Sequence, residues 1–219
     1  WVTFALRRKD WAYRQDQYPT THPIVADIPD VEAAKLNFDG ITYAKGASAL
    51  KQLVAWVGRE AFVEGLRSYF RAHAWRNTTL DDLLDEIEKF SDRDLRAWSA
   101  AWLETAGVNT LRPVVEVDEQ GRYSSVVVEQ THAPDFPTLR PHRIAVGAYR
   151  LRDGRLERTE RIEIDVVLHG DPDDADDPHQ GPGLRWARTE SSLEEGRLSM
   201  YLTGAACTTS PSGWPENTS

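Results

Sequence analysis

The residues best suited to chemistry lie in one short stretch, residues 38–58, which reads FDGITYAKGASALKQLVAWVG. Tyr43 and Lys45 stand just before Gly46, where a helical pattern begins. A tyrosine phenol stays protonated at neutral pH, so it can donate a hydrogen bond to a reacting group. Alternatively, Tyr43 only packs at the start of the helix. A lysine ammonium can attract a carboxylate or remain solvated, and for Lys45 we favour the solvated state.

The helix that must position this stretch is indicated by the spacing of its apolar residues. Ala47, Leu50, Val54 and Val57 recur at intervals of three and four, which places them on one face of a helix. Gly46 lies in its first turn, where a glycine costs about 1 kcal/mol relative to alanine. We therefore expect a structural role for Gly46, which is to let a neighbouring helix pack closely.

Further helices are expected on both sides of this one. Residues 58–75 carry Phe62, Leu66, Tyr69 and Phe70 at helical spacing. A helix after residue 77 would be capped by Asn77, Thr78 or Thr79, and another would be capped by Ser91 or Asp92 and end at Gly107. The first forty residues are broken into loops and short helical pieces by Pro19, Pro23 and Pro29.

The pattern changes to strands after residue 112. Residues 114–117, 123–132, 142–151 and 161–168 are rich in β-branched residues, and in the last of them Ile162, Ile164 and Val166 alternate with acidic residues. Residues 118–121 and 152–155 have the composition of hairpin turns. A small antiparallel β-sandwich is expected.

These zones give an α+β chain with three parts. Residues 1–111 form a helical part, residues 112–170 a β-sandwich, and residues 171–219 a disordered or aberrant tail. The tail is acidic near its start and rich in proline and glycine, and no helical or strand period is sustained in it.

Composition excludes several classes of function. The chain has 219 residues and a formal net charge of −9, which disfavours a nucleic-acid partner. No apolar run approaches the roughly 20 residues of a membrane-spanning helix. The one cysteine, Cys207, excludes a disulfide framework within the chain and suits a reducing compartment, so a cytoplasmic location is expected. The chain begins at Trp1 without an initiator methionine, and we expect it to be a piece of a longer protein.

No metal-binding pattern is present. The six histidines are scattered, and none falls in an H-E-x-x-H motif. The acidic run after residue 170 lacks the register of a calcium loop. For His22, in TTHPI, we expect a capping or loop-fixing role.

Four blocks of the sequence resemble, in order and approximate spacing, the aminopeptidase N family of zinc metallopeptidases, and the bacterial enzymes in particular. The blocks are WAYRQDQYPTTHPI, FDGITYAKGASALKQLV, GLRSYFRAHAWRNTTLDDLL and WLETAGVNTL. The resemblance covers about residues 1–170, and Tyr-x-Lys-Gly-Ala is its most specific part. It implies that the first zone is the helical half of a thermolysin-like catalytic domain, followed by a β-sandwich domain.

The resemblance also implies a role for Tyr43. In that family the matching tyrosine faces the catalytic zinc and donates to the carbonyl oxygen as a zinc-activated water attacks the peptide. The family's Gly-Ala-Met-Glu-Asn and H-E-x-x-H motifs are missing and would lie upstream of Trp1. We therefore expect zinc in the full-length enzyme and none bound to this chain, with peptides as substrates. The expected partner is the missing N-terminal half of the catalytic domain. The alternative is a non-catalytic helical and β interaction module.

Overall fold

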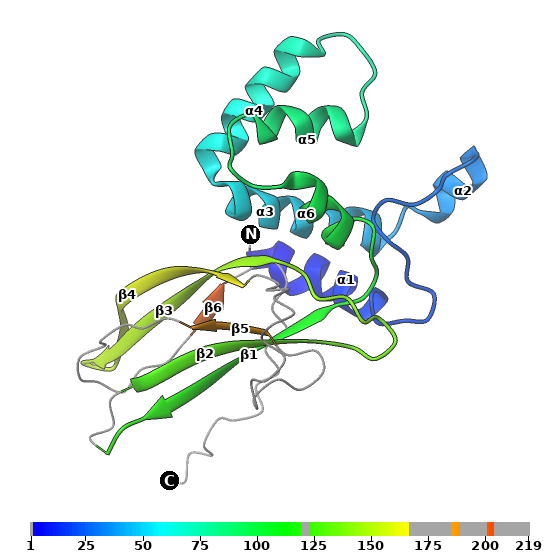
Figure 1. Ribbon diagram of the computed structural model, residues 1–219. Coiled ribbons are helices and arrows are strands. Elements are labelled where there is room, and N and C mark those ends of the chain that lie inside the picture. Colours follow the sequence, from blue (N-terminus) through cyan, green and yellow to red (C-terminus); the bar gives the residue numbers. More distant parts are fainter. Residues whose placement is uncertain (1, 120–122, 167–184, 189–200, 204–219) are drawn as a thin grey trace, which may run out of the picture.

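Helices and antiparallel sheets occupy opposite ends of the molecule, so the predicted α+β class is confirmed (Figure 1). The computed structural model describes residues 2–119, 123–166, 185–188 and 201–203. In order, the helical elements are η1 (Phe4–Lys9), α1 (Asp10–Gln15), α2 (Val31–Leu36), η2 (Ile41–Lys45), α3 (Gly46–Val57), α4 (Arg59–Ala72), α5 (Leu80–Glu88) and α6 (Leu95–Trp102). Among the described residues, no helix has both the length and the apolar character needed to span a membrane.

Helix α3 is present where the sequence predicts it, but its most buried side is displaced by one position from the predicted face. Ala49, Leu53 and Trp56 enter the core of the helical part, and Leu53 is only 1% exposed. Leu50, which the pattern places on the apolar face, is 49% exposed. The core residues also recur at helical spacing, i, i+4 and i+7, so the predicted helical period is correct. The side of α3 that is buried is the one that packs with residues of α5 and α6.

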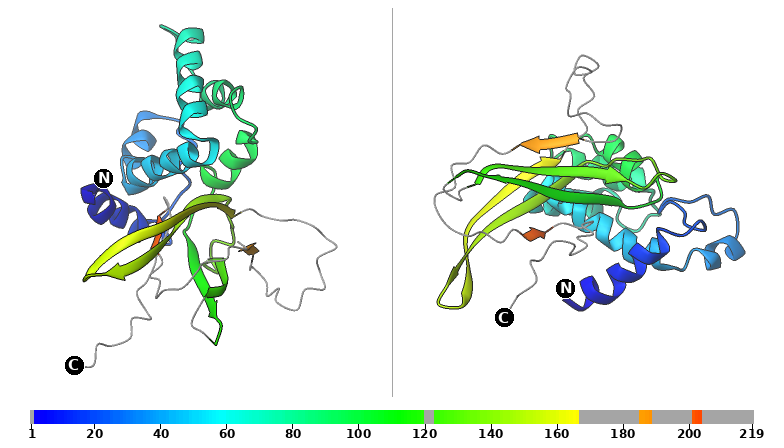
Figure 2. Two further views of the ribbon diagram at one scale, coloured as in Figure 1. Left: turned by 90° about the vertical axis from the view of Figure 1, so that its left-hand side faces the viewer. Right: turned by 90° about the horizontal axis from the view of Figure 1, so that it is seen from below.

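The close approach between helices occurs at Gly65 in α4, and the role predicted for Gly46 is wrong. A Cβ atom at Gly65 would lie 2.5 Å from Cα of Ile87 in α5. A Cβ atom at Gly46 would meet nothing nearer than 3.8 Å, which is ordinary van der Waals contact. The α4–α5 hairpin stands farthest from the sheets (Figure 2), and its close packing depends on this missing side chain.

The helix ends follow general capping rules, although not always at the predicted residue. Thr79 caps α5 in a capping box with Asp82, as one of the three predicted candidates. The cap of α6 is Asp94, whose side chain accepts from the Ala97 N–H, so the prediction of Ser91 or Asp92 is wrong. Helix α6 also ends at Trp102, well before Gly107, because Gly107 belongs to the loop that leads into the first strand.

Two described antiparallel sheets follow the helices. Their strands are β1 (Asn109–Val117), β2 (Tyr123–His132), β3 (His142–Arg152), β4 (Arg155–Val166), β5 (Arg185–Arg188) and β6 (Tyr201–Thr203). The strand orders are β1-β2-β5 and β4-β3-β6. Asp153 and Gly154, both at positive φ, form the β3–β4 turn predicted at residues 152–155. Ile164 and Val166 are buried, and Glu163 is exposed, which confirms the predicted alternation.

The sheet β1-β2-β5 has β1 at its edge, and Pro113 lies within that strand. Pairing with β2 runs in register through Pro113 opposite Val128. The boundary expected between residues 111 and 112 falls inside β1, and the division into domains stays a prediction. The tail predicted at residues 171–219 lies outside the described residues, except for the short strands β5 and β6.

Candidate functional site

Tyr43 lies on a wide helical turn that buries one side and presents the other to solvent. The turn is η2, in which the N–H of Gly46 donates to the carbonyl of Ile41, five residues earlier, as in a π-helix. Ile41 and Ala44 are buried, whereas Tyr43 is 56% exposed. The nearest aromatic contact is the ring of Phe38, with centroids 5.7 Å apart. The phenol is therefore accessible, and its position is set by the backbone of the turn.

Asp39 holds the beginning of this turn. Its Oδ1 accepts hydrogen bonds from the backbone N–H groups of Ile41 at 2.9 Å and Thr42 at 3.0 Å. Its Oδ2 lies 2.8 Å from Nε2 of His22 and accepts a further bond from the Gln15 amide. Burial alone would raise the pKa of Asp39, but the bonds from Thr42, His22 and Ile41 together lower it below its usual value. The carboxylate is thus the favoured form.

Gln15 and His22 bring two distant segments to this carboxylate. Oε1 of Gln15 accepts from the Gly40 N–H at 2.8 Å, and a Cβ at Gly40 would lie 2.7 Å from that oxygen and 2.9 Å from the ring of Trp11. Nδ1 of His22 lies 2.7 Å from the carbonyl of Pro23. The contacts of His22 fit the loop-fixing role predicted for it. The contacts of Gln15 and Trp11 leave no room for a side chain at position 40.

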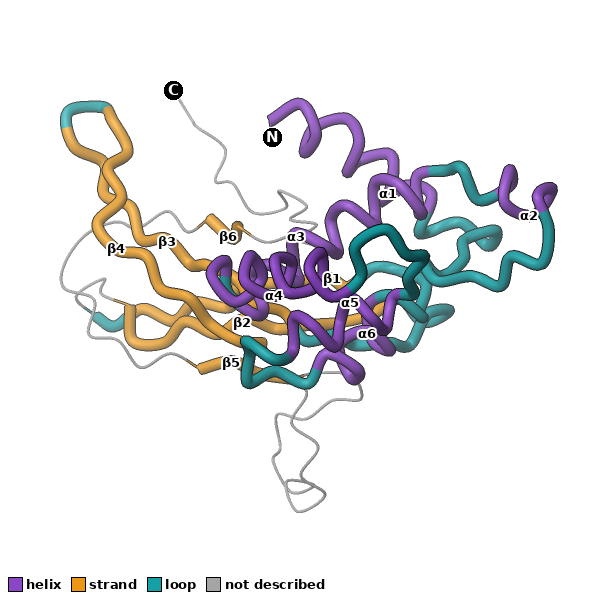
Figure 3. Tube along the Cα trace, turned by 90° about the horizontal axis from the view of Figure 1, so that it is seen from above, coloured by secondary structure: helices purple, strands orange, loops and turns teal. Residues whose placement is uncertain are grey.

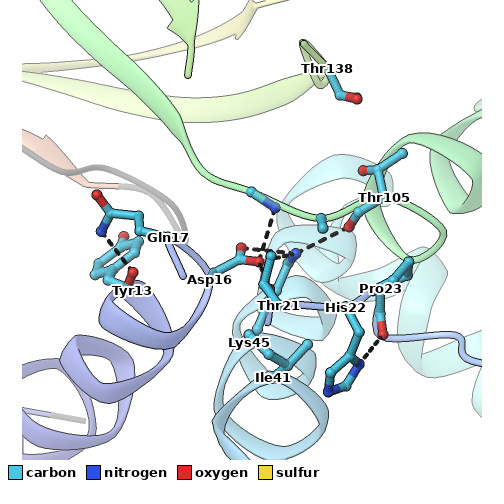
Figure 4. A network of polar contacts seen from close by, with 12 residues as sticks. Tyr13, Asp16, Gln17, Thr21, His22, Pro23, Ile41, Lys45, Thr105 and Thr138 are labelled. Carbon is cyan, nitrogen blue, oxygen red and sulfur yellow. Dashed lines mark hydrogen bonds and ion pairs between the residues drawn. The ribbon is translucent and has the colours of Figure 1, made fainter. Parts of the chain in front are cut away.

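Lys45 is buried, and the prediction that it is solvated is wrong. Its side chain is 11% exposed, and Nζ lies 2.9 Å from Oδ2 of Asp16 and 3.1 Å from the carbonyl of Thr105 (Figure 4). Burial lowers the pKa of Lys45, against the opposing effect of Asp16. Asp16 also accepts from the Thr21 hydroxyl and the Gly107 N–H, at 2.8 and 2.9 Å. Lys45 therefore fixes the end of the turn that begins at Asp39.

Arg140 lies next to this cluster, at the junction between the helices and the sheets, and shares Thr105 with Lys45. Its guanidinium donates to the Ala101 and Ala106 carbonyls and the Thr105 hydroxyl, at 2.7–2.9 Å. Burial lowers the pKa of Arg140. The pocket beside Lys45 and Arg140 is about 40 Å³, enough for a few water molecules but not for a peptide. The side chains at this junction are therefore occupied by one another, whereas the phenol of Tyr43 is exposed.

A zinc ion does not fit the described residues. Nowhere among them do three or more His, Cys, Asp or Glu side chains gather so that they could hold a metal ion. His22 is occupied by Asp39 and Pro23. His142, at the start of β3, is buried against Trp102 of α6, where burial lowers its pKa to about 3. The described residues thus include a hydrogen-bond donor but no metal ligand set.

The sequence predicts a role for Tyr43, which stays a prediction, and does not single out the residues that hold its turn. Asp16, Asp39 and Arg140 were not singled out, because each of them has partners that lie 17 or more positions away in the sequence. One local signal was available. Asp39 stands two residues before Ile41 and three before Thr42. This is the usual spacing between a capping aspartate and the first N–H groups of a helix, from which its side chain accepts.

The comparisons with known proteins agree on one family. Residues 1–106 match the model of the peptidase family M1 domain. The chain is 57% identical over 173 residues to aminopeptidase N of Streptomyces lividans, which covers 76% of this chain and 20% of that protein. It is 35% identical over 119 residues to the Tricorn protease-interacting factor F2 of Thermoplasma volcanium, covering 54% of this chain and 15% of the relative.

Among solved structures, the chain is similar to Legionella pneumophila aminopeptidase A, with 21% identity and a TM-score of 0.44. That match covers 60% of this chain and 16% of the other. The chain spans about a fifth or less of the length of these proteins.

Proposed function

Because residues 1–106 match the peptidase family M1 domain, we propose that this chain is part of an aminopeptidase of that family, an enzyme that removes N-terminal residues from peptides, with Tyr43 as a catalytic residue. The observation that carries the proposal is the geometry of the turn. The phenol is exposed, while the backbone that bears it is tied to Asp39 at one end and Asp16 at the other. An accessible donor on a fixed backbone is what transition-state stabilisation requires.

The role of Tyr43 follows from the charge that develops in peptide hydrolysis. When a nucleophile attacks the peptide carbonyl, negative charge grows on the carbonyl oxygen. The phenol donates a hydrogen bond to that oxygen, and the bond strengthens as the charge grows. Since the interaction is stronger in the transition state than in the bound substrate, it raises kcat more than it tightens binding.

The zinc of the family would be held by residues other than those described, in the part of the enzyme that carries the remaining catalytic residues. A partner surface for that part is available. Leu6, Phe38 and Leu50 are 71%, 69% and 49% exposed on the helical part. We assign these exposed apolar side chains to contacts with the remainder of the catalytic domain. We also propose that residues 1–111 belong to the catalytic domain, that residues 112–170 form the β-sandwich domain, and that the enzyme is cytoplasmic.

The test is the substitution Tyr43→Phe in the complete enzyme that carries this segment. Removing the hydroxyl leaves the ring and its contact with Phe38, so the fold and the zinc content should be unchanged. Loss of one oxyanion donor typically lowers kcat by about 10²–10³ fold. KM for an aminoacyl amide should change little.

Tyr18 provides a matched control, because it is 55% exposed and lies on the loop after α1. Tyr18→Phe should leave kcat within about twofold of the unmodified enzyme, as expected for the loss of one exposed surface hydroxyl. If Tyr43→Phe behaves like Tyr18→Phe, Tyr43 only packs at the helix start, and the non-catalytic interpretation of this residue holds.

A further inference from the structure

The backbone around Tyr43 converges on one residue. The N–H groups of Ile41 and Thr42 donate to the carboxylate of Asp39, and the N–H of Tyr43 donates to the carbonyl of the same residue at 3.1 Å. Three consecutive N–H groups, ending with that of Tyr43, therefore depend on Asp39. At the start of a helix the first N–H groups have no earlier carbonyl to use, so the side chain of Asp39 accepts from Ile41 and Thr42, and its carbonyl accepts from Tyr43.

The orientation of the Asp39 carboxylate is fixed by residues outside the turn. His22 and Gln15 both donate to Oδ2, which leaves Oδ1 directed at the turn. His22 is in turn held by the carbonyl of Pro23. Both donors come from segments that precede the turn by 17 and 24 positions. A carboxylate held in this way by two outside donors has one orientation available to it.

The turn has little freedom to adjust if Asp39 is lost. On one side, Gly40 lies against Gln15 and Trp11 with no space for even a methyl group. At the other end, Lys45 is buried against Asp16. The phenol itself projects from this turn and is largely exposed. A small rotation of the turn is therefore carried directly into a displacement of the phenol oxygen.

We propose that Asp39, oriented by His22 and Gln15, is a positioning residue that sets where the phenol of Tyr43 stands in the active site. This rests on the proposed function, since it assigns Asp39 to the same reaction. Asp39 acts through Tyr43 and need not touch the substrate. A displacement of about 1 Å at a reacting group can lower the rate by about 10² fold, so the expected effect is large although Asp39 is not itself catalytic.

The experiment is a double-substitution cycle in the complete enzyme, with Asp39→Asn measured alone and together with Tyr43→Phe. Asparagine keeps the size of the side chain but cannot accept from both its backbone and its side-chain donors. Alone, Asp39→Asn should lower kcat by about 10- to 100-fold with KM nearly constant. In the Tyr43→Phe background, the same substitution should change kcat by less than about twofold, because the hydrogen bond that it misplaces is already absent.

A second pair of variants tests His22 and guards against misfolding. His22→Gln keeps a side-chain donor that can reach Oδ2, and His22→Ala does not. We expect His22→Ala to lose about 10-fold in kcat and His22→Gln to restore most of it, with both variants showing one cooperative melting transition.

The outcomes are distinguishable. An equal fall in kcat for Asp39→Asn with and without the Tyr43 hydroxyl overturns the positioning role while leaving the proposed function intact. A Tyr43→Phe variant with normal kcat overturns the proposed function instead. A variant of His22 or Asp39 that melts at lower temperature but retains normal kcat below its transition shows that the cluster is only structural, and also overturns the positioning role.

Discussion

Helices α1 and α5 are both attached to the central helices of the molecule, but by opposite chemistry (Figure 3). The attachment of α1 is polar: Gln15 bonds to the turn at residues 39–40, and Asp16, just after the helix, is buried against Lys45. The attachment of α5 is mainly apolar and depends on Ile87 resting on the backbone of α4 at Gly65, with one hydrogen bond from the Ser68 hydroxyl to Glu86 beside it. A polar attachment fixes direction as well as distance, because hydrogen bonds weaken steeply when misaligned. An apolar one tolerates small rotations as long as shape is preserved.

The polar attachment lies next to Tyr43 and the apolar one lies in the α4–α5 hairpin, away from the sheets. The turn that bears Tyr43 is thus tied mainly by directional bonds, and the α4–α5 hairpin is held mainly by the fit of its apolar side chains. Substitutions at the two attachments should therefore change the free energy of unfolding by different amounts, for different physical reasons and with a different dependence on pH.

The largest loss of stability is expected at the centre of the polar attachment. Asp16→Ala removes the partner of a buried lysine and also leaves the Gly107 N–H and the Thr21 hydroxyl without their acceptor. Breaking a buried ion pair in this way costs about 3–5 kcal/mol. The free energy of unfolding, measured in urea, should fall by that amount.

The matched control is Asp10→Ala at the start of α1, the helix that Asp16 follows. Asp10 pairs with Arg14 four residues later, and both side chains are at least half exposed. An exposed pair of this kind contributes about 0.3–0.5 kcal/mol. Similar losses for Asp16→Ala and Asp10→Ala would contradict the view that burial makes the attachment of α1 strong.

The next largest effect is expected where shape alone matters. Gly65→Ala places a methyl group 2.5 Å from Cα of Ile87, so α4 and α5 must separate. Overpacking of this kind costs about 1–3 kcal/mol. Gly46→Ala, in contrast, meets only ordinary contacts and removes a glycine from a helix, so it should be neutral or stabilise by up to about 1 kcal/mol. Thermal melting of the two variants, measured side by side, would show opposite shifts. A stabilised Gly65→Ala would disprove the close contact.

The smallest expected effect is a difference in how the stability contributed by the two attachments depends on pH. The pKa of Asp39 is lower in the folded protein than in the unfolded chain, so its contribution to stability is fully present above about pH 4, the unfolded value, and is lost as the pH falls through the folded value. The difference in unfolding free energy between the protein and Asp39→Asn should therefore shrink in acid. The corresponding difference for Ile87→Val should stay constant, because no proton is involved. Urea titrations between pH 3 and 7 measure both, and a constant difference for Asp39→Asn would refute the assignment.

The sequence predicts elements well where the determining residues are close together. The helix after Gly46, the cap at Thr79 and the strand alternation at residues 162–166 all follow from neighbours within a few positions. The predictions for Lys45 and Gly46 fail for a different reason. Whether a lysine is solvated, or a glycine is needed for packing, is decided by residues far along the chain, here Asp16 for Lys45 and Ile87 for Gly65. The same applies to Asp39, whose donors reach it from two other segments.

The position of Pro113 has a consequence for self-association. An edge strand normally offers a row of free N–H and C=O groups, and such an edge invites pairing with a strand of another molecule, which is how ordered aggregates begin. Proline carries no N–H, and within an edge strand its nitrogen is accommodated on the open side. Among the described residues β1 is an edge strand, and its pairing with β2 is regular from Asn109 to Glu116, on both sides of Pro113. A strand from a second copy approaching β1 would therefore find its ladder of hydrogen bonds interrupted near the middle. The proline leaves the fold of the sheet intact and protects its edge from intermolecular pairing.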